Sequence, residues 1–259
     1  MLTTNPFVDN VLNVPFVALQ IFLILMVVLT IGGVVLDMIH KKNVKFFFEN
    51  AKKAKLSATK SVPTGKKVAI IAKTLAHDVA TSAEFCGVTR RVTHLLGMYG
   101  TIAFWVSSAV LIFSNPTTST WPIIWHVGAL MTCIGGYWFW FIQRVDVRSE
   151  GYSWTRVVFA DLFVMSLVLT STFGLLWSYF QSTNSSVLAV LFFILFALSN
   201  IVLFGGVYWS KFAHMFYKPG AAIQKHLAKA DGSRDDLPEP ADLPKQYGLG
   251  IKRQEPQNY

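Results

Sequence analysis

Histidines are the residues of this chain whose type and spacing best suit chemistry. His94 lies about one helical turn inside an apolar stretch, in "RRVTHLLGMYG". His214 lies about one turn before Lys218, at the end of another apolar stretch. Two imidazoles at similar depth on different helices are the usual axial ligands of a haem b in a membrane. The spacing therefore predicts one haem b with His94 and His214 as its iron ligands.

Small and basic residues near both histidines fit the same prediction. A flat macrocycle needs room beside its ligands and cations to pair with its propionates. Arg91 and Lys211, with Arg90, are the expected propionate partners. The glycines expected to leave room for the ring are Gly97, Gly100, Gly205 and Gly206. The alternative is that both histidines are hydrogen-bonded polar residues at the membrane interface.

The remaining histidines are weaker candidates for ligands. His40 directly precedes two lysines and is expected to face lipid headgroups. His126 has no second histidine at its depth, so we expect a hydrogen-bonded packing residue, with a contact to a quinone headgroup as the alternative. His77 and His226 lie on polar segments and are expected to be solvated.

Motifs of soluble enzymes are missing from the sequence. It contains no HExxH motif, no Walker loop and no dinucleotide fingerprint. The two cysteines, Cys86 and Cys133, are too few for an iron–sulfur cluster and are expected to be small apolar residues. Asp161 is expected to pair with Arg144 or Arg156 rather than to relay protons. We therefore predict no catalytic residue here, and expect any chemistry on a soluble substrate to belong to a partner.

The elements that must position these residues are long apolar helices. Hydrophobic residues make up 53% of the chain and charged residues only 14%, against about a quarter in soluble domains. A helix that crosses a bilayer needs about 20 apolar residues. The sequence predicts an all-α integral membrane protein, a bundle of five transmembrane helices with a cytoplasmic amphipathic loop and an irregular C-terminal tail. The five predicted spans are 15–39, 92–114, 122–143, 157–180 and 186–213.

The distribution of charge predicts the orientation of these spans. All 23 lysine and arginine residues lie within 41–91, 144–156 and 211–259. Cytoplasmic loops carry such an excess of basic residues. We therefore expect a multi-pass protein of the bacterial inner membrane, with its N-terminus outside and its C-terminus in the cytoplasm. The net charge of +9 is then a property of the cytoplasmic face, where it attracts anionic lipids rather than nucleic acid.

The expected domain organisation follows from these boundaries. Residues 1–14 form an outer segment, 15–218 the transmembrane domain, and 219–259 a cytoplasmic tail. Within the basic loop 40–91, residues 68–88 show helical spacing of Ile71, Leu75 and Val79, which predicts an amphipathic helix at the membrane surface. The tail has nearly balanced charge and is rich in proline, so it is either a disordered end or a peptide that docks a soluble partner.

Several short motifs resemble those of a known family. They are Arg91 followed by His94, Pro122 followed by Gly128, Asp161 with Thr172 and Gly174, and "KFAHMFYKP" at 211–219. Over about residues 70–220, the chain resembles the membrane cytochrome b subunits of the nitrate reductase gamma type. It is similar above all to the membrane anchors that accompany dissimilatory adenylylsulfate reductase.

The resemblance implies a function in electron transfer. It implies that the chain links a cytoplasmic flavin/iron–sulfur oxidoreductase, adenylylsulfate reductase, to the membrane quinone pool. Tyr99, Trp125 and Trp177 are candidates to line a quinone pocket, whereas "GYWFWF" at 136–141 is interpreted as an aromatic belt at the inner membrane surface. Two-haem members of the family carry more histidines, so this chain is expected to hold at most one haem. A cofactor-free membrane anchor or assembly protein is the alternative, and a small transporter a weaker one.

Overall fold

The computed structural model describes residues 1–8, 10–83, 85, 87–144 and 155–233 of the chain. Every regular element in these residues is a helix, which confirms the expected all-α class for this part of the chain. The elements are α1 (Phe16–Lys41), α2 (Asn43–Leu56), α3 (Thr64–Lys73), η1 (Thr74–Val79), α4 (Val88–Phe113), α5 (Thr120–Trp138), η2 (Phe139–Gln143), η3 (Phe159–Asp161), α7 (Leu162–Ser182), α8 (Ser186–Gly205) and α9 (His214–Asp231).

Four helical segments are long and apolar enough to cross a membrane, among the residues that the structure describes. They are Phe16–Lys41, Val88–Phe113, Phe159–Ser182 and Ser186–Gly205. The fifth expected span, α5, is not among them. It has 19 residues, but Pro122, His126 and a pair of glycines lower its mean hydropathy. The structure therefore supports a multi-pass membrane protein with four such segments, and a fifth crossing stays a prediction.

The last apolar stretch is shorter than its sequence suggests. The span predicted at 186–213 ends as a helix at Gly205, because consecutive glycines favour the unfolded backbone over continued helix. Residues 206–213 form turns, in which the Ser210 hydroxyl accepts a hydrogen bond from the amide of Phe212. His214 then begins α9, which continues through Pro219. The expectation that His214 ends a spanning helix is therefore wrong.

These elements divide into two compact units. The apolar-helix unit comprises residues 1–37 and 92–213, and the basic-helix unit comprises residues 38–91 with the described part of 214–259. The division separates the spanning helices from most lysines. It also cuts the chain next to His214, whose place in the second unit matters for the predicted haem.

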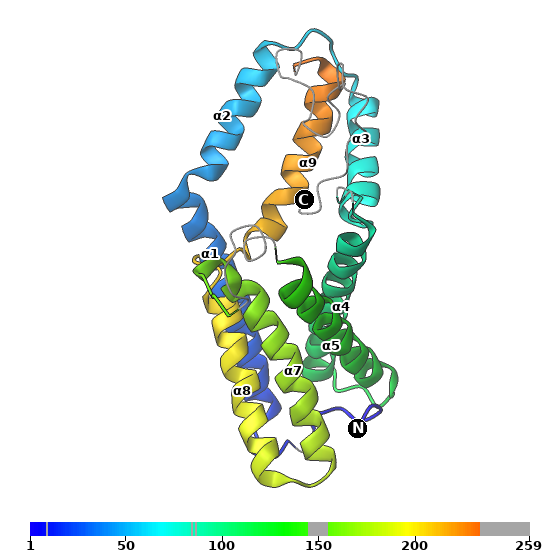
Figure 1. Ribbon diagram of the computed structural model, residues 1–259, viewed down its shortest axis with the longest axis vertical. Coiled ribbons are helices and arrows are strands. Elements are labelled where there is room, and N and C mark those ends of the chain that lie inside the picture. Colours follow the sequence, from blue (N-terminus) through cyan, green and yellow to red (C-terminus); the bar gives the residue numbers. More distant parts are fainter. Residues whose placement is uncertain (9, 84, 86, 145–154, 234–259) are drawn as a thin grey trace. The chain divides into compact units, whose positions relative to one another are not determined.

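Aromatic packing holds the apolar-helix unit together. Helices α7 and α8 lie side by side as an antiparallel pair, and α5 packs against α7 (Figure 1). Trp125 and Trp177 are fully buried, and the ring of Phe7 packs edge-on against both, at centroid distances of 5.9 and 5.4 Å. Because Gln181 also donates a hydrogen bond to the Pro6 carbonyl, the N-terminal segment is an integral part of this core.

Glycines bring α4 and α5 into close contact. A Cβ atom added to Gly100 would lie 2.6 Å from the Thr132 amide nitrogen and 2.8 Å from the Gly128 carbonyl oxygen. A Cβ atom on Gly128 would lie 2.7 Å from the Phe104 amide nitrogen, so the requirement is mutual. Small residues are the usual way in which membrane helices approach backbone to backbone. These two positions therefore determine how α4 and α5 cross.

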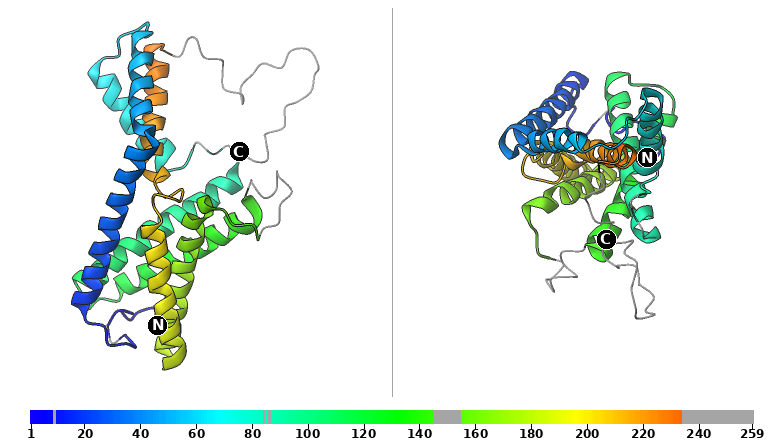
Figure 2. Two further views of the ribbon diagram at one scale, coloured as in Figure 1. Left: turned by 90° about the vertical axis from the view of Figure 1, so that its left-hand side faces the viewer. Right: turned by 90° about the horizontal axis from the view of Figure 1, so that it is seen from above.

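The basic-helix unit is built around α9. This helix contacts α3 and η1 and also α2, and Figure 2 shows α9 beside α2 in both views. The amphipathic helix expected at 68–88 is present but occupies 64–79, as α3 and η1. The apolar residues Val68, Ile71 and Leu75 are exposed. The apolar stripe of α3 thus stays uncovered within this unit, as expected for a helix at a membrane surface.

Candidate functional site

The two predicted haem ligands belong to different units. His94 is half-buried on α4, next to the buried Thr93, in the apolar-helix unit. His214 is exposed at the first position of α9, in the basic-helix unit. Neither unit by itself brings the two imidazoles together among the residues described, so their joint ligation of a haem stays a prediction.

Only some of the glycines expected to leave room for the haem have open space beside them. Gly97 has open space where a Cβ atom would lie, and so does Gly205. Gly100, by contrast, is fully used by the contact with α5, so it leaves no room for a macrocycle. That part of the prediction is wrong, because the glycine serves helix packing. A haem at this face of α4 would have to approach beside Gly97.

The predicted propionate partners have other surroundings. The guanidinium of Arg91 donates two hydrogen bonds to Thr81, one to its carbonyl oxygen at 2.7 Å and one to its hydroxyl at 2.9 Å. Arg91 therefore fastens the end of η1 to the start of α4. Lys211 is exposed in the turn that precedes α9. Arg91 is thus engaged by Thr81, and its pairing with a haem propionate stays a prediction.

His126 is a packing residue, as the sequence predicts. Its ring is buried, with Nδ1 2.7 Å from the Pro122 carbonyl oxygen and Nε2 2.8 Å from the Ser178 hydroxyl. A carbonyl only accepts, so Nδ1 carries the proton and Nε2 accepts from Ser178. Both nitrogens are satisfied, and the imidazole links α5 to α7. A quinone headgroup would have to displace one of these bonds.

The tryptophans proposed for a quinone pocket lie in the core instead. Trp125 donates from its indole nitrogen to the Ser108 hydroxyl at 2.9 Å, and Trp177 donates to the Gln181 side chain at 2.9 Å. Their rings contact each other edge to face. Tyr99 is exposed on α4. These three residues therefore do not enclose a ligand site in the described structure.

An aromatic cavity lies elsewhere in the apolar-helix unit, between the end of α5 with η2 and the start of α7. Its volume is about 310 Å³. The rings of Tyr137 and Phe141 stack one turn apart, and the Tyr137 hydroxyl lies 2.9 Å from the Thr172 hydroxyl on α7. Nearly all of its surface is apolar. The residues that line it are Tyr137, Trp140, Phe141, Thr155, Val157, Val164, Met165, Val168 and Leu169.

A buried ion pair adjoins this cavity. The guanidinium of Arg144 donates to Asp161, which confirms one of the two pairings expected for this carboxylate. The same guanidinium donates to the Arg156 carbonyl at 2.5 Å and lies 4.2 Å from the ring centre of Trp140. Asp161 also accepts from the Val158 amide at 3.0 Å. The Trp140 ring therefore lines the cavity and also contacts the Arg144 cation.

Sequence reasoning missed this cavity because "GYWFWF" matches an ordinary aromatic belt. The spacing of Trp140 and Arg144, four residues apart in the sequence, was the available signal for a ring with a bound cation. Cys133 is buried, as expected, whereas Cys86 lies outside the described residues. The part of the tail from residue 234 onward lies outside them as well.

Comparison of the chain with protein-family models, with curated proteins and with solved structures finds no match.

Proposed function

We propose that this protein is a membrane subunit that anchors a cytoplasmic oxidoreductase and exchanges electrons between that enzyme and membrane quinone. The observation that carries the proposal is the aromatic cavity beside the buried Arg144–Asp161 pair. A quinone ring needs an apolar site with a few polar groups that orient it. Trp140 and Phe141 offer ring contacts, and Tyr137 offers a hydroxyl.

The chemistry required of the site is modest. A quinone takes up two electrons and two protons to become a quinol, and a quinol releases them when electrons flow the other way. The Tyr137 hydroxyl can accept a hydrogen bond from Thr172 at 2.9 Å while it donates its own proton to a quinone oxygen. Arg144 is neutralised by Asp161, so the pair polarises this region without leaving an uncompensated charge.

The membrane arrangement belongs to the proposal. Four apolar helical segments, with α5 as a fifth crossing, would place the N-terminus outside and the C-terminus in the cytoplasm of a bacterium with this protein in its inner membrane. The basic-helix unit and the tail would then face the cytoplasm, where the partner binds. The partner class, a flavin/iron–sulfur enzyme such as adenylylsulfate reductase, comes from the resemblance of the sequence motifs.

Photolabelling tests the quinone site. The protein is reconstituted in nanodiscs and irradiated with an azido-quinone, with and without excess decylubiquinone. We expect label on the peptides that contain 137–141 or 164–169, and we expect decylubiquinone to suppress it. Label spread over all lipid-facing helices without competition would contradict the proposal.

A matched pair of variants sharpens this test. Val164→Trp places a large ring in the cavity, whereas Val127→Trp places the same ring at an exposed position of α5. The first should abolish competitive labelling and the second should leave it unchanged. If both variants label like the parent protein, quinone does not bind in this cavity.

Flotation tests the anchor separately. Purified adenylylsulfate reductase should float with liposomes that contain the full chain and should stay at the bottom of the gradient with empty liposomes. Loss of flotation with intact photolabelling would refute the partner and leave the quinone site standing. The reverse result would leave an anchor without a quinone site.

A cofactor-free anchor is the second candidate. Gly100 packs against α5 and Arg91 is hydrogen-bonded to Thr81, although the sequence predicts that both residues serve a haem. A haem b bound by His94 and His214 would supply one-electron transfer. A visible absorption spectrum of protein purified from haem-sufficient cells distinguishes the two. If haem is present, His94→Ala and His214→Ala should each abolish its spectrum, whereas His126→Ala should not.

A further inference from the structure

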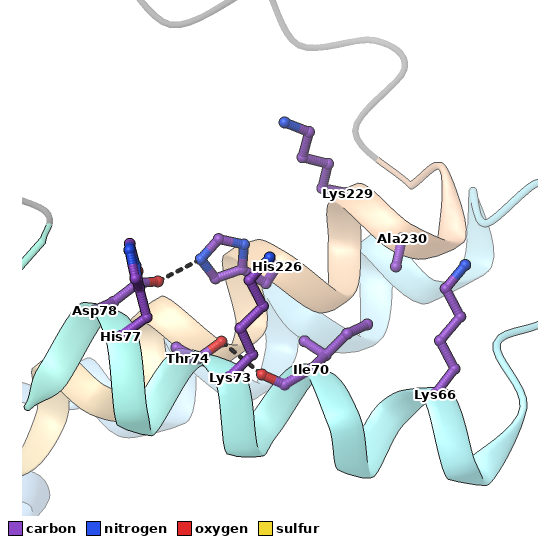
Figure 3. Close-up of a pocket in the computed structure, with 9 residues that line it drawn as sticks. All are labelled: Lys66, Ile70, Lys73, Thr74, His77, Asp78, His226, Lys229 and Ala230. Atoms are coloured by element: carbon purple, nitrogen blue, oxygen red, sulfur yellow. Dashed lines mark hydrogen bonds and ion pairs between the residues drawn. The ribbon is translucent and has the colours of Figure 1, made fainter.

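A second cavity lies within the basic-helix unit, between α9 and the helix formed by α3 and η1 (Figure 3). Its volume is about 430 Å³, large enough for a small organic molecule. Figure 3 shows Lys66 and Lys73 rising from α3 toward α9, and Lys229 projecting from α9. The residues that line it are Lys66, Ile70, Lys73, Thr74, His77, Asp78, His226, Lys229 and Ala230.

The charges around this cavity are unbalanced. Asp78 is the only carboxylate among the lining residues, and it is already engaged by His226 at 2.6 Å and by His77 at 2.9 Å. Among the residues that the structure describes, no carboxylate lies within ion-pair distance of Lys66, Lys73 or Lys229. Three lysines thus line one cavity, and the described part of the chain offers them no unengaged carboxylate.

This arrangement suits a compact polyanion. Three lysines from two helices give the cavity an excess of positive charge, and a bound tetrahedral oxyanion would offset that charge. Lysine binds phosphate groups as a point charge, and the imidazoles can add directional donors. Lys66, Lys73 and Lys229 are exposed, so ligands from solution can reach the cavity.

The position of the cavity relative to the apolar face of α3 indicates whether an anion would reach it from solution or from the membrane. At about 100° per residue, Lys66, Ile70 and Lys73 share one face of the helix. The exposed apolar residues Val68, Ile71 and Leu75 lie on the opposite face. If that stripe rests on a membrane, the cavity faces the aqueous side. A soluble ligand therefore reaches it more directly than a lipid headgroup does.

We propose that this cavity binds a small soluble anion that carries a phosphate group, held by Lys66, Lys73 and Lys229. Asp78 is not a ligand; it fixes the imidazoles of His77 and His226 at the edge of the site. The proposal is independent of the quinone site, which lies in the other unit.

Calorimetry with inorganic pyrophosphate tests the proposal on the full chain in phosphatidylcholine nanodiscs. We expect saturable binding with one site per chain. Lys73→Gln combined with Lys229→Gln should weaken it by about tenfold or more, because the pair supplies two of the three cations at this solvent-exposed site. The matched control, Lys52→Gln with Lys53→Gln, removes the same charge from α2 and should leave the affinity unchanged. Circular dichroism of each variant verifies that its helices are intact.

The same titrations distinguish a soluble ligand from diffuse attraction and from a lipid headgroup. Absence of saturable binding, or an equal loss of affinity in both double variants, would show only diffuse attraction to a basic surface and would overturn the proposal. Nanodiscs that contain phosphatidylglycerol test the lipid source. Pyrophosphate affinity should be unchanged there after correction for the negative surface potential of the lipid. Competition by the lipid that the Lys73/Lys229 variant abolishes would assign the site to a headgroup and refute a soluble ligand.

Discussion

Nε2 of His226 on α9 lies 2.6 Å from one carboxylate oxygen of Asp78 on η1, and Nδ1 of His77 lies 2.9 Å from the other (Figure 3). The pKa of the Asp78 carboxyl is lowered, first by its hydrogen bond with His77 and also by its hydrogen bond with His226. One carboxylate therefore ties α9 to η1 within the basic-helix unit.

Removing this carboxylate should loosen α9. Asp78→Asn keeps the shape of the side chain but loses its charge, so the bond to His226 weakens by about 1 kcal/mol at this partly exposed site. Hydrogen exchange of the α9 amides should become about fivefold faster. Glu49→Gln, which removes a carboxylate from the exposed pair with Lys45 on α2, is the control and should leave α9 unchanged. Equal exchange in both variants would show that Asp78 does not hold the helix.

The same tether predicts a pH dependence. Because the pKa of Asp78 is lower when folded than its ordinary value of 3.8, its contribution is complete above pH 3.8 and is lost as the pH falls through the folded pKa. The carboxylate therefore keeps its full contribution at every pH above that ordinary value. The difference in α9 exchange between the parent and Asp78→Asn should persist to pH 4 and vanish in stronger acid. A difference that vanishes well above pH 4 would show that the Asp78 carboxylate is not the group responsible.

The contact of Gly100 with α5 predicts a sharp contrast between two glycines of α4. Gly100→Ala places a methyl group within 2.6 Å of backbone on α5, whereas Gly97→Ala places one in open space. Overpacking of this kind costs about 1–3 kcal/mol, while alanine for glycine in a helix is otherwise favourable. Thermal unfolding in detergent should therefore occur at a lower temperature for Gly100→Ala and at an equal or higher one for Gly97→Ala. Equal transitions would mean that α4 and α5 do not cross here.

The buried Arg144–Asp161 pair predicts non-additive effects. Arg144→Met leaves the Asp161 carboxylate, which is 8% exposed, without its cation and should cost about 3–5 kcal/mol. Adding Asp161→Asn removes the stranded charge, so the double variant should be more stable than Arg144→Met alone. Unfolding in mixed micelles measures both. If the second substitution destabilises further by its own full amount, the two residues are not coupled.

The pairing of Asp161 was predictable from sequence because a carboxylate in an apolar segment needs a cation, and few lie close by in the chain. The end of α8 was not. Hydropathy reports how residues partition into lipid, and Val207, Tyr208 and Trp209 continue the apolar stretch after the backbone has left the helix at Gly205. The expectation that His214 ends a spanning helix rested on that continuity, and for this reason it was wrong.

Contacts between distant segments were also beyond the sequence. His226 and Asp78 are 148 residues apart, and nothing in either neighbourhood indicates the other. The expectation that His77 and His226 are merely solvated missed their shared carboxylate. The aromatic cavity likewise requires knowing that the end of α5 faces the start of α7. A single sequence predicts which residues are apolar or charged, but pairing them requires the packing of the helices.

Whether α5 crosses the membrane decides the orientation of everything after it. Its 19 residues span about 28 Å as a helix, close to the bilayer core of about 30 Å. Its most polar side chain, His126, has both nitrogens hydrogen-bonded, which removes much of the cost of placing it in lipid. These two facts favour a fifth crossing despite the low mean hydropathy of the helix.

Alkaline phosphatase fusions test this crossing, because the enzyme is active only outside the cytoplasm. With five spans, a fusion after residue 117 should be active, and fusions after residues 150 and 259 should be inactive. A fusion after residue 184, between α7 and α8, should again be active. If α5 does not cross, the fusions after 117 and 150 report the same side, and the one after 184 reports the opposite side. That result would mean that the protein has four spans, with both of its termini on one side of the membrane.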